Sequence, residues 1–166
     1  MIDIFFVRHA KASAKTAGEE DFSRPLSKRG RNDSRLIGQE LLRVHGRETS
    51  QVLCSSSKRT LQTAEMLTSI GLIKSSEIVS HDQLYLADPH DITKVIEKHF
   101  PFSTKRVFLI GHNPGMTVLA DLIPNIKLDH LPTGGVIHIQ YPKDSKSWNW
   151  SHSKIQSVIY PKLLKS

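Results

Sequence analysis

The sequence has very little cysteine. Cys54 is the only one among 166 residues, so the chain cannot form a disulfide with itself. It has no apolar run long enough to span a bilayer, and its first residues lack the basic and apolar regions of a signal peptide. Its nine histidines form no close His-x-x-x-His pair and no His-rich tract, so we expect no metal and no other cofactor. These absences favour a cytoplasmic protein without membrane contact.

Acidic residues are also fewer than basic ones, so the chain has a formal net charge of +7. A basic protein favours anionic partners, which include phosphoesters, acidic proteins and nucleic acids. The lysines and arginines are scattered and form no dense run, which argues against binding to nucleic acid. The hydrophobic share of 38% and the length are those of an ordinary globular domain. We therefore expect one domain over residues 1–166.

Short apolar runs alternate with helical patterns along most of the chain. The expected strands cover residues 2–7, 51–54, a weaker segment around Ile78, and 107–110. Four helical patterns follow these strands. The first begins after Ser27 and stops at Gly46, and the second ends at Gly71. The third follows Pro89 and runs to about His99, and the fourth extends from Met116 to Ile123.

The pattern changes after Pro132. Residues 136–139 and 155–159 each predict a strand, and a polar turn at 143–145 joins them. Repeated strand–helix units followed by a hairpin predict an α/β fold. We expect a mostly parallel central sheet with helices on both faces and a C-terminal hairpin at one edge.

Three of the expected parallel strands end in unusual polar sequences. Arg8-His9 follows the first strand, residues 55–60 follow the second, and Gly111-His112-Asn113 follows the fourth. Each has an ordinary structural explanation: a charged strand end, a serine helix cap and a turn. Ligands of such sheets bind at the carboxyl ends of the strands, where these segments meet. Their cationic and N–H groups together predict a phosphate site.

Four segments resemble the motifs of one family. Val7-Arg8-His9-Ala10, the segment 24–30 that begins Arg24-Pro25-Leu26, residues 55–64, and Gly111-His112-Asn113-Pro114 are similar to signatures of the histidine phosphatase (phosphoglycerate mutase-like) superfamily. The motifs occur in the family's order and reach to about Ile123. The short chain and the Arg-Pro-Leu segment look most like the SixA-type phosphohistidine phosphatases. The resemblance implies a phosphoglycerate mutase-like fold.

The resemblance also implies roles for individual residues. His9 would be the nucleophile, and a phosphohistidine intermediate would form there and be hydrolysed by water. Arg8, Arg59 and His112 would bind the phosphoryl oxygens. An attacking imidazole must be neutral, and neighbouring cations favour that form because they repel a protonated ring. Arg24 would either reach the same pocket or form an exposed salt bridge.

A general acid has no obvious equivalent in this sequence. Asp88 is the best-placed candidate, although an aspartate before Pro89 is equally typical of a helix N-cap. An alkoxide leaving group needs a proton, whereas the ring of a phosphohistidine leaves readily once it is protonated. The missing acid therefore favours phosphohistidine on a partner protein as the substrate. A small phosphoester is the alternative.

Three other functions fit the sequence less well. A cysteine phosphatase would use Cys54, but only four residues separate it from Arg59 and none is glycine, so the phosphate loop would be short and stiff. A non-catalytic phosphate-binding module would have no need for a nucleophile such as His9. A mutase would need a lid, for which the chain is short. The sequence does not predict the oligomeric state.

Overall fold

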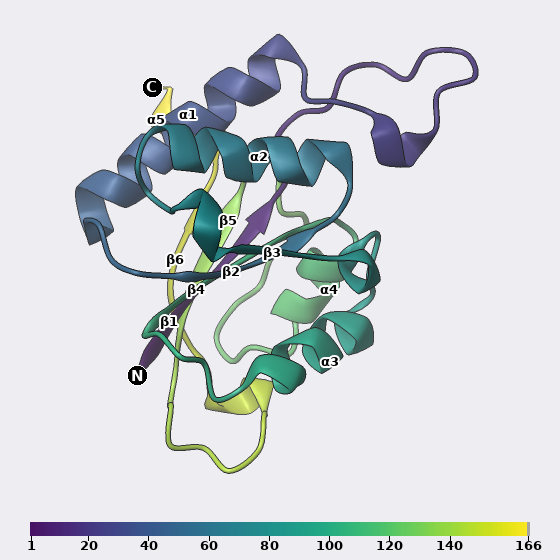
Figure 1. Ribbon diagram of the computed structural model, residues 1–166. Helices are drawn as coiled ribbons and strands as arrows, with labels where there is room; N and C mark the ends of the chain where they lie inside the picture. The colour runs from purple at the N-terminus through teal and green to yellow at the C-terminus, as the bar shows by residue number, and fades with distance from the viewer. Residues whose placement is uncertain (166) are drawn as a thin grey trace.

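The computed structural model describes residues 1–165 and is built on one six-stranded sheet (Figure 1). The strands lie in the order β3-β2-β4-β1-β5-β6. They are β1 (Ile2–Arg8), β2 (Gln51–Ser55), β3 (Ile78–His81), β4 (Arg106–Gly111), β5 (Val136–Tyr141) and β6 (Lys154–Ile159). The first four are parallel to one another, and β5 and β6 are antiparallel at one edge. The predicted sheet and its C-terminal hairpin are confirmed.

Helices cover both faces of the sheet, as predicted. α1 (Lys28–His45) and α2 (Lys58–Ser69) lie on one face, and α3 (Pro89–His99) and α4 (Gly115–Ala120) lie on the other (Figure 1). Single 3-10 turns and a last short helix complete the chain: η1 (Asp21–Ser23), η2 (Ser75–Glu77), η3 (Asp82–Leu84), η4 (Trp150–His152) and α5 (Pro161–Leu164). Within residues 1–165, no helix has the length and apolar character needed to cross a membrane.

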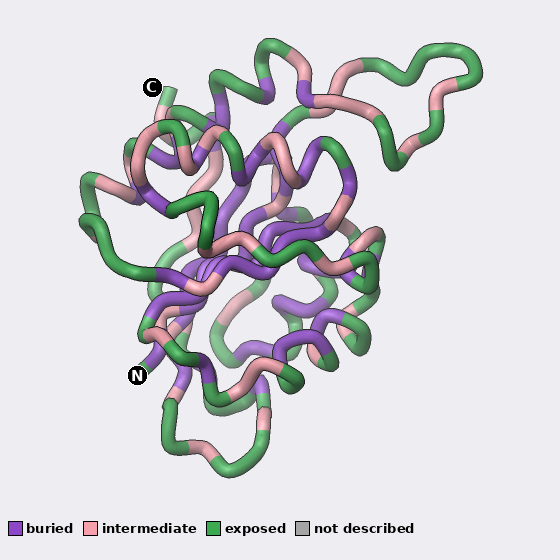
Figure 2. The backbone as a smooth tube through the Cα atoms, in the orientation of Figure 1, coloured by how far each residue is buried: buried purple, intermediate pink, exposed green. Residues whose placement is uncertain are grey.

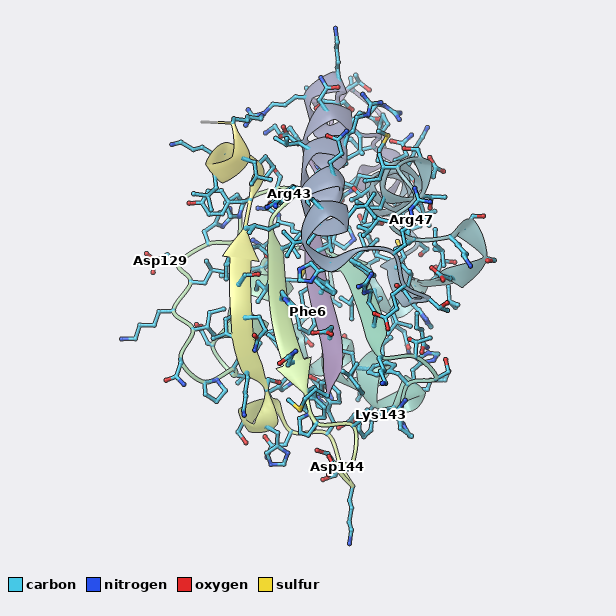
Figure 3. The ribbon with its side chains drawn as sticks, turned by 90° about the vertical axis from the view of Figure 1, so that its left-hand side faces the viewer. Phe6, Arg43, Arg47, Asp129, Lys143 and Asp144 are labelled. Carbon is cyan, nitrogen blue, oxygen red and sulfur yellow. The ribbon has the colours of Figure 1, made fainter. Side chains whose placement is uncertain are left out.

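Strand β1 is apolar from Ile4 to Val7, where it is buried on both faces. Its side chains alternate between two cores. Ile4 and Phe6 pack on the side of α3 and α4, whereas Phe5 and Val7 pack on the side of α1 and α2. Figure 2 shows the central strands β1, β2, β4 and β5 as the buried centre of the molecule, and Figure 3 labels Phe6 there. A continuous apolar run is what this double burial requires.

Two predicted elements differ in detail from the structure. Helix α4 ends at Ala120, three residues before Ile123, although Ile123 is still buried. The connection between β5 and β6 is much longer than a turn at 143–145. Lys143 and Asp144 lie at its outer tip (Figure 3), and the chain then brings Trp150 back into the core. The indole N–H of Trp150 donates to Thr93 Oγ1 at 2.9 Å, which ties this connection to α3.

The strand register places the three polar segments together at the carboxyl ends of neighbouring parallel strands. Arg8 pairs with Gly111, and Cys54 pairs with Ile110, so β1, β2 and β4 end side by side. The chain after β1 then runs outward as an exposed arm before α1 begins (Figure 2). Short 3-10 helix η1 lies in this arm, and its first residue, Asp21, contacts α2 through Arg59.

Candidate active site

A cleft of about 420 Å³ lies at the carboxyl ends of β1 and β4. The structure brings together there the four residues on which the sequence prediction rests, and two more join them. These six are Arg8, His9, Arg59, His112, Arg24 and Asp21. Residues that are up to about a hundred positions apart thus share one small space.

His9 follows directly on β1 and is nearly buried. Its Nδ1 lies 2.7 Å from the carbonyl oxygen of Ala10. A carbonyl can only accept a hydrogen bond, so Nδ1 carries the ring proton. The other nitrogen, Nε2, accepts a hydrogen bond of 3.2 Å from Nε of Arg59. The free electron pair of His9 is therefore on Nε2 and faces Arg59.

His112 follows β4, and its ring centroid is 5.1 Å from that of His9. Its Nδ1 lies 3.4 Å from Nη2 of Arg59, and a guanidinium can only donate. The ring proton of His112 must then be on Nε2, which donates to Oγ of Ser55 at 2.8 Å. Ser55, the last residue of β2, thus fixes the tautomer of His112.

Both imidazoles are uncharged at neutral pH. Burial is the largest cause that lowers the pKa of His9 to about 4; the hydrogen bond to Ala10 opposes it, and Arg59, Arg8 and Arg24 add to it. Burial, followed by the repulsion that a protonated His9 and Arg59 would exert on a second cation, lowers the pKa of His112 to about 3. The expected effect of the cations is present, but loss of solvent contributes more.

Arg59 lies in the first turn of α2, and its side chain is only 3% exposed. Thr60 Oγ1 donates to the carbonyl of Ser55 at 2.7 Å, which ties the start of the helix to the end of β2. From this position Arg59 donates through Nη1 to the main-chain oxygen of Asp21 at 2.7 Å and through Nη2 to Oδ2 of Asp21 at 2.9 Å. One guanidinium therefore contacts His9, His112 and Asp21.

Arg8 reaches the cleft from the other side. Its Nη1 donates to the carbonyl of Leu131 at 2.8 Å and to Nε2 of His130 at 3.0 Å. Its Nε is buried and has no hydrogen-bond partner in the part of the chain that the structure describes. Such an unused N–H beside a cleft is available to an oxyanion. No sequence pattern linked Arg8 with residues 130 and 131.

Arg24 lies at the same cleft, and its role in binding phosphate stays a prediction. It lines the cleft, and its Nη2 forms an ion pair of 3.1 Å with Oδ1 of Asp21. The sequence does not predict a role for Asp21 or for Tyr85, whose hydroxyl donates to Oδ2 of Asp21 at 2.7 Å. The one local signal was an acidic residue three positions before Arg24. No pattern pointed to Tyr85.

Asp88 lies outside this group. Its carboxylate accepts from the backbone N–H of Asp91 at 2.8 Å and caps α3, and its side chain is exposed. The residues that line the cleft do not include it. The suggestion of a general acid at position 88 is corrected: the helix-cap interpretation describes this residue.

Cys54 is fully buried, and burial raises the pKa of its thiol to about 12. A reactive cysteine must be a thiolate. The geometry therefore gives no support to the cysteine phosphatase alternative.

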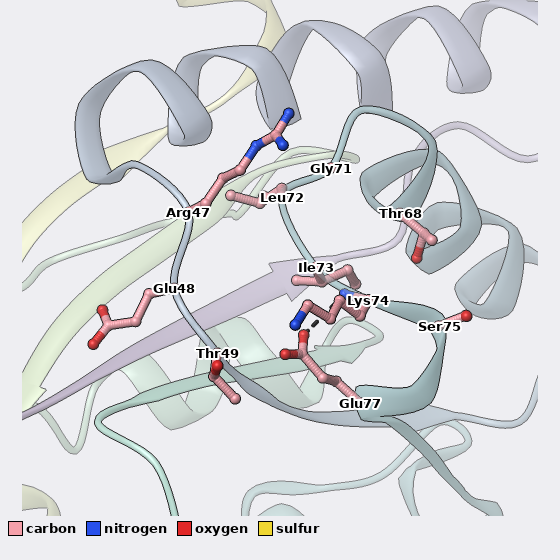
Figure 4. Close-up of a pocket in the computed structure, with 10 residues that line it drawn as sticks. All are labelled: Arg47, Glu48, Thr49, Thr68, Gly71, Leu72, Ile73, Lys74, Ser75 and Glu77. Atoms are coloured by element: carbon pink, nitrogen blue, oxygen red, sulfur yellow. Dashed lines mark hydrogen bonds between the residues drawn. The ribbon is translucent and has the colours of Figure 1, made fainter.

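A second cleft, of about 640 Å³, lies at the amino ends of β2 and β3 (Figure 4). Of its two acidic residues, Glu77 accepts hydrogen bonds from the backbone N–H groups of Lys74 at 2.9 Å and Ser50 at 3.1 Å, and Glu48 forms an ion pair of 3.3 Å with Arg106. Both carboxylates of this cleft thus have structural partners. Its lining contains no histidine or cysteine. Although larger, this cleft therefore has none of the imidazole groups that the cleft at His9 contains. Nowhere in residues 1–165 do three histidine, cysteine or acidic side chains form a group that could hold a metal ion.

A comparison with protein families gives a match to the model of the histidine phosphatase superfamily (branch 1) over residues 4–84. The matched span contains Arg8, His9, Arg24 and Arg59. Over this span, which is just under half of the chain, the sequence is similar to the histidine phosphatase superfamily.

Individual proteins of known sequence or structure are similar to this chain along most of its length. An uncharacterized protein from Picosynechococcus sp. is 26% identical over 147 residues, which are 84% of this chain and 85% of that protein. The structure of the protein histidine phosphatase SixA complexed with tungstate has a TM-score of 0.81 and 22% identity and covers 99% of this chain and 100% of that chain. SixA from Agrobacterium tumefaciens gives 0.78 and 23%, with 96% and 98% covered.

A phosphoglycerate mutase from Bacillus anthracis has the same general fold, with a TM-score of 0.69, 13% identity, and 98% of this chain and 95% of that chain covered. At such identities these structures establish the fold. It is a phosphoglycerate mutase-like fold in its SixA form.

Proposed function

We propose that the chain is a phosphatase that uses His9 as its nucleophile and passes through a phosphohistidine intermediate. One observation supports this most: the Nδ1–H of His9 is bonded to the Ala10 carbonyl, which leaves the electron pair on Nε2 beside Arg59. A buried, neutral imidazole with one nitrogen fixed and the other directed at guanidinium groups is prepared to attack phosphorus.

The first chemical step transfers the phosphoryl group to His9. Arg59 Nε–H turns from Nε2 to a phosphoryl oxygen, and the unused Nε–H of Arg8 binds another. The Nε2–P bond forms as the bond from phosphorus to the leaving atom breaks, and the leaving atom keeps that electron pair. The guanidinium groups balance the charge on the phosphoryl oxygens, which a metal ion does in many other enzymes.

Water completes the reaction. It attacks phosphorus, the Nε2–P bond breaks, and its electron pair returns to His9, while one proton of the water passes to solvent or phosphate. His112 assists both steps, because a phosphoryl dianion beside Nδ1 stabilises the protonated ring, whose Nδ1–H then donates to an oxygen. Ser55 keeps the other nitrogen of His112 in place.

The substrate that we propose is phosphohistidine on a partner protein. Asp88 caps a helix, and the Tyr85 hydroxyl and Arg59 lower the pKa of Asp21, so neither carboxyl is suited to protonate an alkoxide at neutral pH. An imidazole leaving group that already carries a proton on its other nitrogen leaves as the neutral ring. Leu86 lines the cleft and is 52% exposed, which offers an apolar contact to a protein surface. The structurally similar SixA proteins are described as a protein histidine phosphatase and a phosphohistidine phosphatase, which supports the same substrate class.

The proposal is tested with p-nitrophenyl phosphate in the presence of EDTA. We expect the wild type to release p-nitrophenol and His9→Ala to lose at least about a thousand-fold in rate. His90→Ala, which removes an exposed histidine from α3, is the matched control and should keep full activity. Equal rates for His9→Ala and the wild type would remove the proposed nucleophile.

The substrate class needs a second comparison. Rates of phosphate release are measured with a protein domain that carries phosphohistidine and with a panel of small phosphoesters. A higher kcat/KM for the protein supports the proposal. A higher value for one small ester would favour a small-molecule phosphomonoesterase instead.

A further inference from the structure

Asp21 is the counterion of a buried arginine. Both of its oxygen-bearing groups accept from Arg59: the main-chain oxygen from Nη1 at 2.7 Å, and carboxylate Oδ2 from Nη2 at 2.9 Å. A buried guanidinium needs a partner of opposite charge. Within residues 1–165, Asp21 is the only acidic side chain that forms an ion pair with Arg59.

The carboxylate is itself held from two other directions. Tyr85, which lies after η3, donates its hydroxyl to Oδ2 at 2.7 Å, and Arg24 contacts Oδ1 at 3.1 Å. The Tyr85 ring is also part of the site, because its centroid is 5.9 Å from Cζ of Arg59 and 5.5 Å from the centroid of His112. Asp21 and Tyr85 thus form a support behind Arg59.

Arg59 uses some of its N–H donors to bind Asp21 and others to contact the two histidines of the cleft. Two of its nitrogens are bonded to residue 21, while Nε faces His9 and Nη2 also faces His112. If Asp21 were absent, the guanidinium could rotate, and its Nε–H would no longer be directed at the position of the phosphoryl group. A shift of about 1 Å in such a group can cost about a hundred-fold in rate.

We propose that Asp21 is a positioning residue, held by the hydroxyl of Tyr85, that fixes the Arg59 guanidinium against His9 and His112 in the orientation that receives the phosphoryl group. This inference rests on the proposed function. It assigns a task to η1 and to the residue after η3, two segments that contribute no group to the chemistry itself.

Asp21→Asn tests the inference because it removes the charge and keeps the size of the side chain. Loss of the carboxylate removes a repulsion on bound phosphate, whereas a misdirected Arg59 binds phosphate less well, so the inhibition constant of inorganic phosphate should change little. The orientation of Arg59 is lost, so kcat should fall about 10-fold to 100-fold. A variant that is merely misfolded would instead bind phosphate more weakly.

Leaving groups separate this role from acid catalysis. Asp21→Asn is measured with p-nitrophenyl phosphate, which has a good leaving group, and with phenyl phosphate, which has a poorer one. A positioning residue predicts the same fold-loss for both esters. A loss that is much larger for phenyl phosphate would overturn the inference and make Asp21 a general acid. An increase in rate would overturn it too, because Asp21 would then be a blocking group.

Tyr85→Phe supplies the second variant, since it keeps the ring and removes only the hydroxyl. We expect a smaller loss than for Asp21→Asn, and no further loss when the two changes are combined, because they act through one contact. If the double variant lost activity by the product of the two single losses, the two residues would not act through one contact. Glu20→Gln is the matched control: it makes the same charge change at the exposed neighbouring position and should have wild-type kinetics.

The wild type separates the two proposals. A wild type without His9-dependent release would refute the proposed function and this role together. An active wild type with an equally active Asp21→Asn would refute only the inference.

Discussion

The two imidazoles in the cleft have partners of fixed hydrogen-bonding type. The Ala10 carbonyl can only accept and the Arg59 guanidinium can only donate, so the contacts assign the proton of each ring without further assumption. The sequence predicts that His9 and His112 meet. It could not predict their tautomers, because these depend on Ser55 and on the local path of the backbone.

The acid side of the pH–rate profile follows from the environment of His9. Attack on phosphorus needs the neutral ring, and burial above all lowers the pKa of His9 from 6.5 to about 4. Activity is therefore lost on protonation as the pH falls through about 4, well below the ordinary range of histidine. The measurement is kcat/KM from pH 8 downward, corrected for ionisation of the substrate. An acid limb that stays near 6.5 would contradict the burial of the attacking nitrogen.

At the scale of elements, capping residues in the sequence predicted where helix α1 begins and ends, because these ends depend on local interactions. Ser27 caps α1 by accepting from the N–H of Gly30 at 3.0 Å, and Gly46 ends the same helix with a φ of 65°, where glycine is favoured. The arm between β1 and α1 has no such local signal. The contact of Asp21 with Arg59 depends on tertiary packing, so no periodicity or capping pattern could reveal it.

Helix α3 provides a test of the correction at Asp88. Its carboxylate accepts from the N–H of Asp91 at the amino end of the helix. Asp88→Ala should lower the free energy of unfolding by about 1 kcal/mol and leave kcat/KM unchanged. Urea denaturation and steady-state kinetics on the same preparation measure both. A folded Asp88→Ala protein with a large loss of kcat would show that Asp88 acts in the reaction after all.

On the scale of the whole molecule, the parallel register does most to build the site. Because the carboxyl ends of β1, β2 and β4 lie side by side, the strand–helix pattern was enough to predict that Arg8, Arg59 and His112 converge. The groups that hold these residues were not predictable. His130, for example, contacts Arg8 from 122 positions away, in a connection without regular structure.

Burial of histidine also makes the stability of the whole chain depend on pH. Burial is the first cause that lowers the pKa of six of the nine histidines: His9, His45, His81, His99, His112 and His138. The unfolded chain, in which these groups have their ordinary pKa, binds more protons below about pH 6.5 than the folded chain does.

The free energy of unfolding should therefore decrease as the pH is lowered from 7 toward 4. Acidic groups with a lowered pKa, such as Asp21, act in the same direction, but only at lower pH. Urea denaturation at a series of pH values gives the number of protons taken up on unfolding from the slope. A stability that is constant or rises from pH 7 to pH 5 would contradict the burial of these rings.

The most direct test of the account is to trap the phosphorylated enzyme. The protein is mixed with a phosphoryl donor, quenched with base because a phosphorus–nitrogen bond is labile to acid, and mapped by peptide sequencing and phosphorus NMR. We expect one phosphorylated residue, His9, with phosphorus on Nε2, since Nδ1 is bonded to the Ala10 carbonyl. Phosphorus on Nδ1, on another residue, or on none during turnover would contradict the account.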